Sequence, residues 1–291
     1  DSTYLVGYFT NDNGFDAAIT ISRELRTISI VFRGSDEQLD WLTNFTAFQT
    51  SMKVSGIDIP AEAKVHLGAW NQLKKDNCIE QIVRVVYELA QQFEDGLGDY
   101  YIVISGHSLG GGLADIFAYI FQLYLEQRGS CGEHRNICLI TYNPTKNITP
   151  YIADYLKKSN LVSICMIHEY DPAYAALYNV YRILGFVFAA DRVYIVNENG
   201  DVRIGPNDEP PKYTEWELAK RWVSGEAKVL TAYHNFDNLM WIDSLTLVGA
   251  TDGAVQTNPV KVLIDEHKRL MEGVAPPTTQ EGVAPTGAGG S

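Results

Sequence analysis

The sequence of 291 residues has few cysteines, few basic residues and no long uninterrupted apolar run. The four cysteines show no Cys-x-x-Cys spacing, which argues against a zinc or dithiol redox site, so we expect no metal. Lys and Arg number 23 against 36 Asp and Glu, and the formal net charge of −13 argues against binding to nucleic acid or to strongly anionic membranes. The most apolar stretch, residues 173–190, is short for a membrane span and contains Arg182. We therefore expect no transmembrane segment, and interpret this stretch as a wall of the core or of an apolar cleft.

The thiols are those of Cys78, Cys131, Cys138 and Cys165. Cys131 and Cys138 flank a short polar loop and fit a disulfide, and free thiols fit the sequence equally well. The chain begins at Asp1 without a Met or an apolar leader, which fits both a removed signal peptide and the absence of one. Of the two compartments, we favour a secreted over a cytoplasmic protein.

The chain is organised around residues 100–117, where Gly106-His107-Ser108-Leu109-Gly110 lies between two apolar patterns. The β-branched run before it is typical of a buried strand, and the small residues after it lead into a helical pattern. A strand that reverses at once into a helix strains the middle residue, and glycines two positions to either side let the neighbouring backbones pass. Gly-x-Ser-x-Gly in this context indicates a nucleophile elbow with Ser108 as the nucleophile. A glycine-rich turn with an ordinary serine is the alternative for the bare pattern.

Apolar periodicity indicates alternating strands and helices along the chain. Strands are predicted at residues 17–21, 27–32, 101–104, 137–142 and 161–168, and a hairpin at 192–197 and 202–204; helices are predicted at 36–48, 71–93, from the elbow to 127, and at 150–158, 213–223 and 259–271, with a loop at 49–64. This alternation predicts the α/β class, with a mainly parallel central sheet and helices on both faces. We predict one domain over residues 1–271 and a flexible Gly-, Pro- and Thr-containing tail over 272–291.

A serine nucleophile needs a histidine base, and the base needs an orienting carboxylate. In the α/β-hydrolases, whose serine lies on such an elbow, the carboxylate and then the base follow the nucleophile along the chain. The order leaves four candidates for the base: His134, His168, His234 and His267. His134 lies in a charged loop and His267 beside charged residues on a late helix, so we expect both to be solvated. We select His234, which is late and loop-like.

The orienting carboxylate is expected in a turn just outside the sheet, at the end of a strand. Asp171 fits this place, because it begins an Asp-Pro turn directly after the strand at 161–168. The rival carboxylates are Glu169, Asp154 and Asp191. Two further histidines, His66 and His107, are interpreted as packing residues rather than catalysts.

Two donors are needed to bind the oxyanion that forms when a serine attacks a carbonyl. The backbone N–H of Leu109 is one candidate, and Ser35, which follows the strand at 27–32, is the other. A plain turn is the alternative at residue 35. The next segment, 36–48, has apolar residues at three- and four-residue spacing, which predicts a short amphipathic helix or an ordinary surface helix with a core face.

Several of these pieces occur together in a fixed order: Val31-Phe32-Arg33-Gly34-Ser35, Asp40-Trp41-Leu42, Val65-His66-Leu67-Gly68, the elbow with Gly111, Asp171-Pro172 and His234. By these residues, over roughly positions 4–240, the chain resembles the fungal-type class 3 lipases of the α/β-hydrolase fold. It departs from them at Gly112, where the family commonly has Ala or another small residue. It departs again at residues 142–146, which lack the usual glycine.

The resemblance implies a triad of Ser108, Asp171 and His234, and an oxyanion hole formed by Ser35 and Leu109. It implies that the segment 36–48 is a lid that opens at a lipid surface, with Leu39, Trp41, Leu42 and Phe45 as its apolar residues. It also implies ester hydrolysis through an acyl-enzyme, without a metal or nucleotide cofactor.

The expected function is a lid-gated serine carboxylic ester hydrolase acting on acylglycerols or related lipids, with a lipid or ester substrate at a neutral lipid interface. A phospholipase, a galactolipase or an aryl-ester esterase on the same scaffold is the alternative, because the lid segment is both apolar and acidic. A catalytically silent interaction protein is a third interpretation, against which the complete set of triad residues counts.

Overall fold

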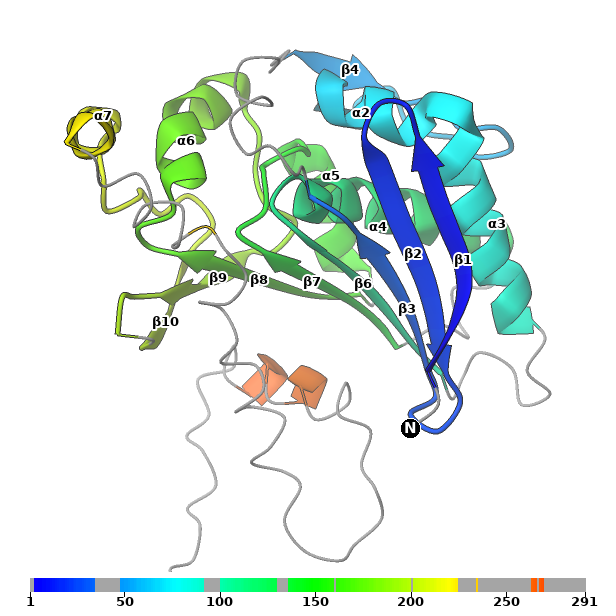
Figure 1. Cartoon of the computed structure of the whole chain (residues 1–291). Helices are drawn as coiled ribbons and strands as arrows, with labels where there is room; N and C mark the ends of the chain where they lie inside the picture. The colour runs from blue at the N-terminus through cyan, green and yellow to red at the C-terminus, as the bar shows by residue number, and fades with distance from the viewer. Residues whose placement is uncertain are drawn as a thin grey trace, which may run out of the picture.

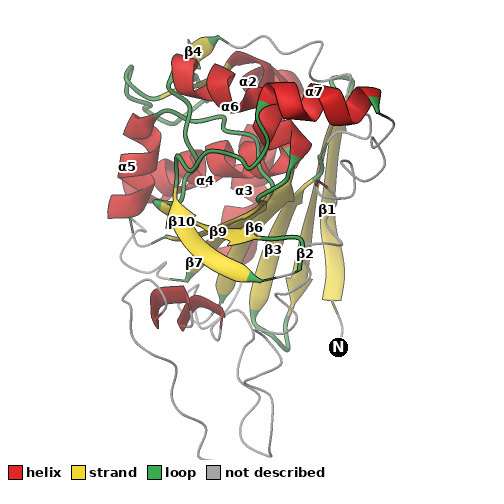
Figure 2. Ribbon diagram, turned by 90° about the vertical axis from the view of Figure 1, so that its left-hand side faces the viewer, coloured by secondary structure: helices red, strands yellow, loops and turns green. Residues whose placement is uncertain are grey.

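The chain folds around an eight-stranded sheet, and most helices lie over one of its faces, as the computed structural model shows (Figures 1 and 2). The structure describes residues 3–34, 48–91, 100–129, 136–159, 161–199, 201–224, 234, 263–265 and 267–269. Residues 36–47 of the predicted lid segment lie outside the described residues, and so does the predicted tail, residues 272–291.

The strands follow the spatial order β1-β2-β3-β6-β7-β8-β9-β10. They are β1 (Thr3–Asn11), β2 (Phe15–Ser22), β3 (Thr27–Phe32), β6 (Tyr101–His107), β7 (Ile137–Tyr142), β8 (Val162–His168), β9 (Arg192–Val196) and β10 (Val202–Pro206). Neighbours from β3 to β9 are parallel, whereas β1–β2, β2–β3 and β9–β10 are antiparallel. The prediction of a mainly parallel sheet is confirmed, with antiparallel additions at both edges.

Two pieces of extended chain differ from the sequence-based expectation. The predicted loop at 49–64 contains a short strand β4 (Gln49–Ser51), which pairs with β5 (Lys64–His66) in a separate small sheet. The edge strand β1 had no predicted counterpart, because both of its faces carry exposed apolar residues and its register shifts between Leu5 and Gly7. Periodic burial, the signal on which strand prediction rests, is therefore missing there.

The helices are α2 (Leu67–Lys74), α3 (Cys78–Gln91), α4 (Leu109–Gln127), α5 (Pro150–Lys158), α6 (Pro172–Leu184) and α7 (Glu215–Val223). Residues 263–265 and 267–269 are also helical and lie on the opposite face of the sheet (Figure 1). No helix in the described part of the chain is long and apolar enough to cross a membrane.

The single helix predicted at 71–93 is wrong in its start and in its continuity. It begins at Leu67, where the His66 side chain caps it, and a 3₁₀ turn at Lys75–Asn77 separates α2 from α3. Asp76 and Asn77 take left-handed backbone conformations, with φ of 55° and 53°, which Asp and Asn tolerate better than most residues.

Helix α6 was also missed, since the apolar run at 173–190 was interpreted only as a wall. Its sequence signals were present, namely Asp171 as N-cap, Pro172 in the first turn and Gly185 at the C-cap with φ of 70°.

The core lies between the sheet and α4, a helix that is buried on nearly all sides. Ile102 and Ile104 of β6 face α4, whereas Val103 points to the other face and packs with Leu263 and Ile264. Cys78, Cys138 and Cys165 are buried free thiols, so Cys138 does not form the disulfide considered for it.

Backbone packs directly on backbone where β6 turns into α4. A Cβ atom on Gly110 would overlap the carbonyl oxygen of Phe32, and one on Gly106 would overlap the backbone of Gly110. Only glycine lets the ends of β3 and β6 and the start of α4 come this close. These contacts fix the position of the residue between the two glycines, Ser108.

We predict that Gly110→Ala lowers the free energy of unfolding by about 1–3 kcal/mol, because a methyl group cannot enter this contact without moving a strand. Urea denaturation measures the loss. Gly14→Ala is the control, because a Cβ there meets nothing within 4 Å. Its φ of 74° is left-handed whereas Gly110 lies in α4, so any backbone strain of the added Cβ falls on the control. A loss at Gly110 no larger than at Gly14 would show that the close approach is not a constraint.

Candidate active site

Ser108 lies between β6 and α4 in a strained backbone conformation, with φ of 56° and ψ of −127°. Its peptide groups hold it there. The Ser108 N–H donates to the Tyr142 carbonyl at 2.9 Å, and its own carbonyl accepts from Gly111 N–H at 3.0 Å and Thr145 N–H at 3.1 Å. A strained residue persists only where its surroundings over-determine it, and here three elements do so.

A continuous chain of hydrogen bonds starts at this serine. Ser108 Oγ lies 2.8 Å from His234 Nε2, and His234 Nδ1 lies 2.8 Å from Asp171 Oδ2. All three residues are buried, at 3%, 2% and 1% exposure. A carboxylate only accepts, so His234 Nδ1 carries the proton and Nε2 is left to accept the proton of the serine hydroxyl.

The two oxygens of Asp171 have separate partners. Oδ1 accepts from the backbone N–H groups of Ala173 at 2.7 Å and Tyr174 at 3.1 Å, so Asp171 caps α6. This leaves Oδ2 directed at His234. The Asp171-Pro172 turn therefore positions the carboxylate through the helix that it starts.

Two opposing effects set the pKa of His234. Burial lowers it, and the charge of Asp171 together with the hydrogen bond to that carboxylate raises it by more, so the pKa lies above its ordinary value of 6.5. The imidazolium is thus stabilised by the carboxylate that also orients the ring.

His107, interpreted from the sequence as a packing residue, contacts the same histidine. Its Nε2–H donates to the His234 carbonyl at 2.6 Å, and the two rings lie 4.9 Å apart. Burial lowers the pKa of His107, and the neighbouring His234 lowers it further, so His107 stays a neutral donor. Asn143, which the sequence analysis did not single out, is a second donor to that carbonyl, at 3.1 Å.

On the oxyanion side, Leu109 is the first residue of α4, where backbone N–H groups have no partner within the helix. Gly34 passes directly over Ser108: a Cβ there would lie 2.8 Å from the His107 carbonyl oxygen and 3.3 Å from Ser108 Cβ. Ser35 follows next in the chain, and it lies outside the described residues, as do the proposed lid residues Leu39, Trp41, Leu42 and Phe45.

The rings of the other described histidines make hydrogen bonds to groups other than Ser108 and Asp171. His168 Nδ1 accepts from Tyr170 N–H, and His66 Nδ1 accepts from Ala69 N–H. His267 was expected to be solvated, but it is half-buried beside the Tyr194 hydroxyl, and burial lowers its pKa to about 4. His134 lies outside the described residues.

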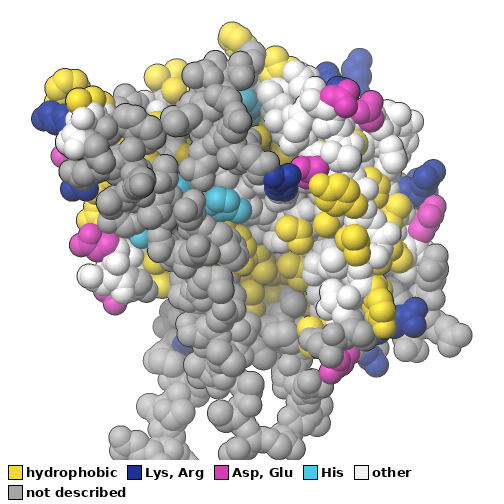
Figure 3. All heavy atoms as spheres, in the orientation of Figure 1, with side chains coloured by type: hydrophobic (Ala, Val, Ile, Leu, Met, Phe, Trp, Pro, Cys, Tyr) yellow, Lys and Arg dark blue, Asp and Glu magenta, His cyan; other side chains and the backbone are white. Residues whose placement is uncertain are grey.

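A hollow of about 520 Å³ adjoins the site, lined by residues that include Gly34, His107, Tyr142 and Val31. Apolar side chains gather on the neighbouring surface over β1 to β3 (Figure 3), where Leu5 is the most exposed large one.

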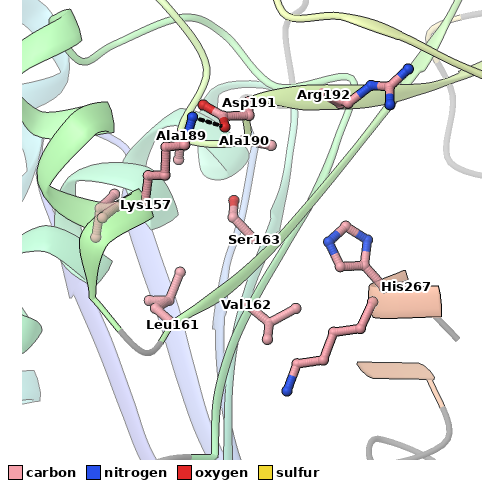
Figure 4. A pocket seen from close by; sticks show the side chains of 11 residues that line it. Lys157, Leu161, Val162, Ser163, Ala189, Ala190, Asp191, Arg192 and His267 are labelled. Carbon is pink, nitrogen blue, oxygen red and sulfur yellow. Dashed lines mark ion pairs between the residues drawn. The ribbon is translucent and has the colours of Figure 1, made fainter. Parts of the chain in front are cut away.

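A second hollow of about 410 Å³ is lined by none of Ser108, His234 and Asp171 (Figure 4). It lies between α5, the start of β8 and His267, and Lys157 and Asp191 form an ion pair at its rim. Within the described ranges, no group of three His, Cys, Asp or Glu side chains is placed to hold a metal ion.

In Asp171→Asn, we predict that the pKa of His234 falls below 6.5, because burial remains while the charge that opposes it is gone. In the unchanged protein, the raised pKa stabilises the fold below pH 6.5, and this contribution is lost as pH rises through the folded-state value. NMR titration of the imidazole measures the shift. Asp154→Asn on the exposed side of α5 is the control, and an unaltered His234 pKa in Asp171→Asn would contradict the assignment.

Comparison with known proteins agrees with this architecture. The model of the class 3 lipase family matches residues 29–177, just over half of the chain. The secreted alkaline triacylglycerol lipase of Penicillium cyclopium is 28% identical over 110 residues, which are 37% of this chain and 34% of that protein. The chain thus matches about a third of the length of this curated relative.

Solved structures share the fold. Rhizomucor miehei triacylglyceride lipase superposes with a TM-score of 0.57 at 22% identity, covering 74% of this chain and 79% of the lipase. A triacylglycerol lipase from Penicillium expansum gives a TM-score of 0.56 at 18% identity, covering 73% and 77%. With the family match spanning half of the sequence, the chain belongs to the class 3 lipase family.

Proposed function

We propose that this protein is a serine carboxylic ester hydrolase, a lipase that cleaves acylglycerol esters with Ser108 as the nucleophile. The observation that carries the proposal is the buried chain of hydrogen bonds from Ser108 Oγ through both nitrogens of His234 to Asp171, 2.8 Å at each step. Membership of the class 3 lipase family supports ester chemistry, and the relatives from Penicillium and Rhizomucor are described as triacylglycerol or triacylglyceride lipases.

In the proposed acylation step, His234 Nε2 removes the hydroxyl proton while Ser108 Oγ attacks the ester carbonyl carbon. The resulting imidazolium is stabilised by Asp171, which already raises the His234 pKa. The tetrahedral oxyanion is bound by the Leu109 N–H and by Ser35, and its collapse releases the alcohol, which takes the proton from His234. The ester bond is broken and an acyl-serine remains.

Deacylation repeats these roles with water as the nucleophile. His234 removes a proton from the water, hydroxide adds to the acyl carbonyl, and Ser108 leaves as the alcohol with that proton. The products are a carboxylic acid and the original enzyme. Since neutral His234 is needed for each attack, the rate is expected to fall as the pH drops through the raised pKa of His234.

The substrate is proposed to be a lipid ester at a neutral interface, with the segment 36–48 as the lid. Four apolar residues of that segment and the apolar surface over β1 to β3 support this choice, and the net charge of −13 disfavours an anionic surface. Secretion is supported by the description of the Penicillium cyclopium relative as secreted. A phospholipase, galactolipase or aryl-ester esterase remains the alternative on the same triad.

Ser108→Ala is expected to lower kcat on p-nitrophenyl butyrate by at least about 10⁴-fold, because no other group takes over the covalent step. A serine-reactive fluorophosphonate should label the unchanged protein and not this variant. Ser163→Ala is the matched control, since Ser163 lines the hollow remote from the triad and should keep full activity and labelling. Activity retained in Ser108→Ala, or no labelling of the unchanged protein, would refute the serine hydrolase proposal.

The lipase assignment predicts a steep rise in rate on p-nitrophenyl palmitate once the ester forms an interface, with no such rise on dissolved butyrate. The rise should be smaller on droplets doped with an anionic lipid and should recover with added salt, because charge repulsion is screened. Rates measured below and above the point of interface formation test this. Activity on butyrate alone would assign a soluble-ester esterase, and a preference for phospholipid or galactolipid droplets would assign the corresponding alternative.

A further inference from the structure

The structure assigns to Asn143 a role that nothing in the sequence pattern predicts: its side-chain amide positions the catalytic histidine and the strand end that carries the catalytic carboxylate. Asn143 follows β7 and lies in the stretch that departs from the family's usual sequence. This inference rests on the proposed function, because it concerns the base of that reaction. Asn143 acts through His234 and is therefore a positioning residue.

Both ends of the amide are used. Asn143 Oδ1 accepts from the His168 N–H at 2.7 Å, and Nδ2 donates to the His234 carbonyl at 3.1 Å. The partners fix the orientation of the amide, since an N–H group requires the oxygen and a carbonyl requires the nitrogen. Asn143 is 3% exposed, so water does not substitute for these partners from the surface.

The bond from the His168 N–H to Asn143 Oδ1 holds a residue that is itself hydrogen-bonded to Asp171. The carbonyl of His168 accepts from the Asp171 N–H at 2.9 Å, and the Asn143 N–H donates to the Met166 carbonyl at 2.7 Å. The end of β8 and the Asp171 turn are therefore held against Asn143 by main-chain bonds. The Asn143 side chain thus connects this turn to His234, which lies 91 positions after Asn143 in the sequence.

The second bond fixes the histidine at its backbone. The His234 carbonyl receives Asn143 Nδ2–H and His107 Nε2–H, so both acceptor positions of that oxygen are occupied. A peptide plane held in this way limits where the imidazole can lie relative to Ser108 and Asp171. Misplacing a catalytic group by about 1 Å can cost on the order of 100-fold in rate, so such a constraint matters for turnover.

Asparagine also suits the backbone at this position. Its φ of 41° lies in the left-handed region, which Asn adopts more readily than other residues with a side chain. Glycine also fits this conformation but offers neither bond. Asn143→Gly therefore removes the amide without adding backbone strain, which makes it the informative substitution.

We expect Asn143→Gly to lower kcat on p-nitrophenyl butyrate by about 10- to 100-fold, with KM unchanged within about twofold. Rates are expressed per active serine, counted by fluorophosphonate titration, so that unfolded protein does not contribute. The pH below which kcat/KM falls should shift downward, because a displaced His234 loses part of the Asp171 interaction that raises its pKa.

Asn147→Gly is the matched control. Asn147 is equally buried in the same loop, and its amide makes no hydrogen bond to any described residue. It is expected to keep kcat and the pH profile whatever it does to stability. Asn143→Asp is the second variant, assayed above neutral pH: it keeps the shape and the acceptor for His168 N–H but replaces the donor, and should lose kcat like Asn143→Gly.

A readout independent of turnover is the NMR resonance of the His234 Nδ1 proton and the imidazole titration. Both should change in Asn143→Gly and not in Asn147→Gly. A kcat within twofold of the unchanged protein, an equal loss in the control, or an unaltered His234 titration would overturn the role of Asn143. Failure of the unchanged protein to label or turn over would instead refute the proposed function, and the imidazole readout would still decide whether Asn143 positions His234.

Discussion

A buried loop has to satisfy its backbone polar groups inside the protein, and residues 143–149 are buried without interruption. Some of their partners lie at the site or in the segments beside it, and others lie in β5. The Thr145 N–H donates to the carbonyl of Ser108, and the Ile148 carbonyl accepts from the Val187 N–H beyond α6. The turn at Ser108 and the segment after α6 are thus fixed by one loop, which cannot move without leaving buried groups unpaired.

The same loop explains the run of glycines after Ser108. A Cβ on Gly111 would lie 2.7 Å from Pro144 Cβ, and a Cβ on Gly112 would overlap the Asn147 amide and the Thr145 side chain. Gly112 and the loop are the two places where the sequence departs from its family, and here they touch. The glycine is therefore a requirement of this loop, and the two departures compensate each other sterically.

Local sequence patterns were sufficient to predict several strands, one helix and the turn that holds Ser108. Strands such as β3 and β7 and the all-round apolar helix α4 follow from periodicity, and Ser108 follows from the spacing of its glycines. The break at Asp76 was missed because neighbouring residues do not signal a left-handed backbone. Chain order and an Asp-Pro turn were enough to choose His234 and Asp171, which the structure brings together with Ser108. The role of Asn143 could not be predicted from local patterns, because its partners His168 and His234 lie 25 and 91 positions away.

The position of the Asp171 carboxylate depends on α6, the helix that it caps. Lys146 packs against a side chain of this helix. Lys146, in the buried loop, donates to the Asn207 carbonyl and lies 5.2 Å from the ring of Tyr174 and 4.5 Å from that of Phe188. Burial lowers the pKa of Lys146 to about 8, whereas the faces of the two rings favour its charged form. The backbone N–H of Tyr174 also donates a helix-capping hydrogen bond to Asp171 Oδ1. Asn143 and Thr145 therefore hold His234 and Ser108 by hydrogen bonds, and Lys146 packs against the helix that Asp171 caps. The geometry of all three residues depends on this part of the loop, residues 143–146.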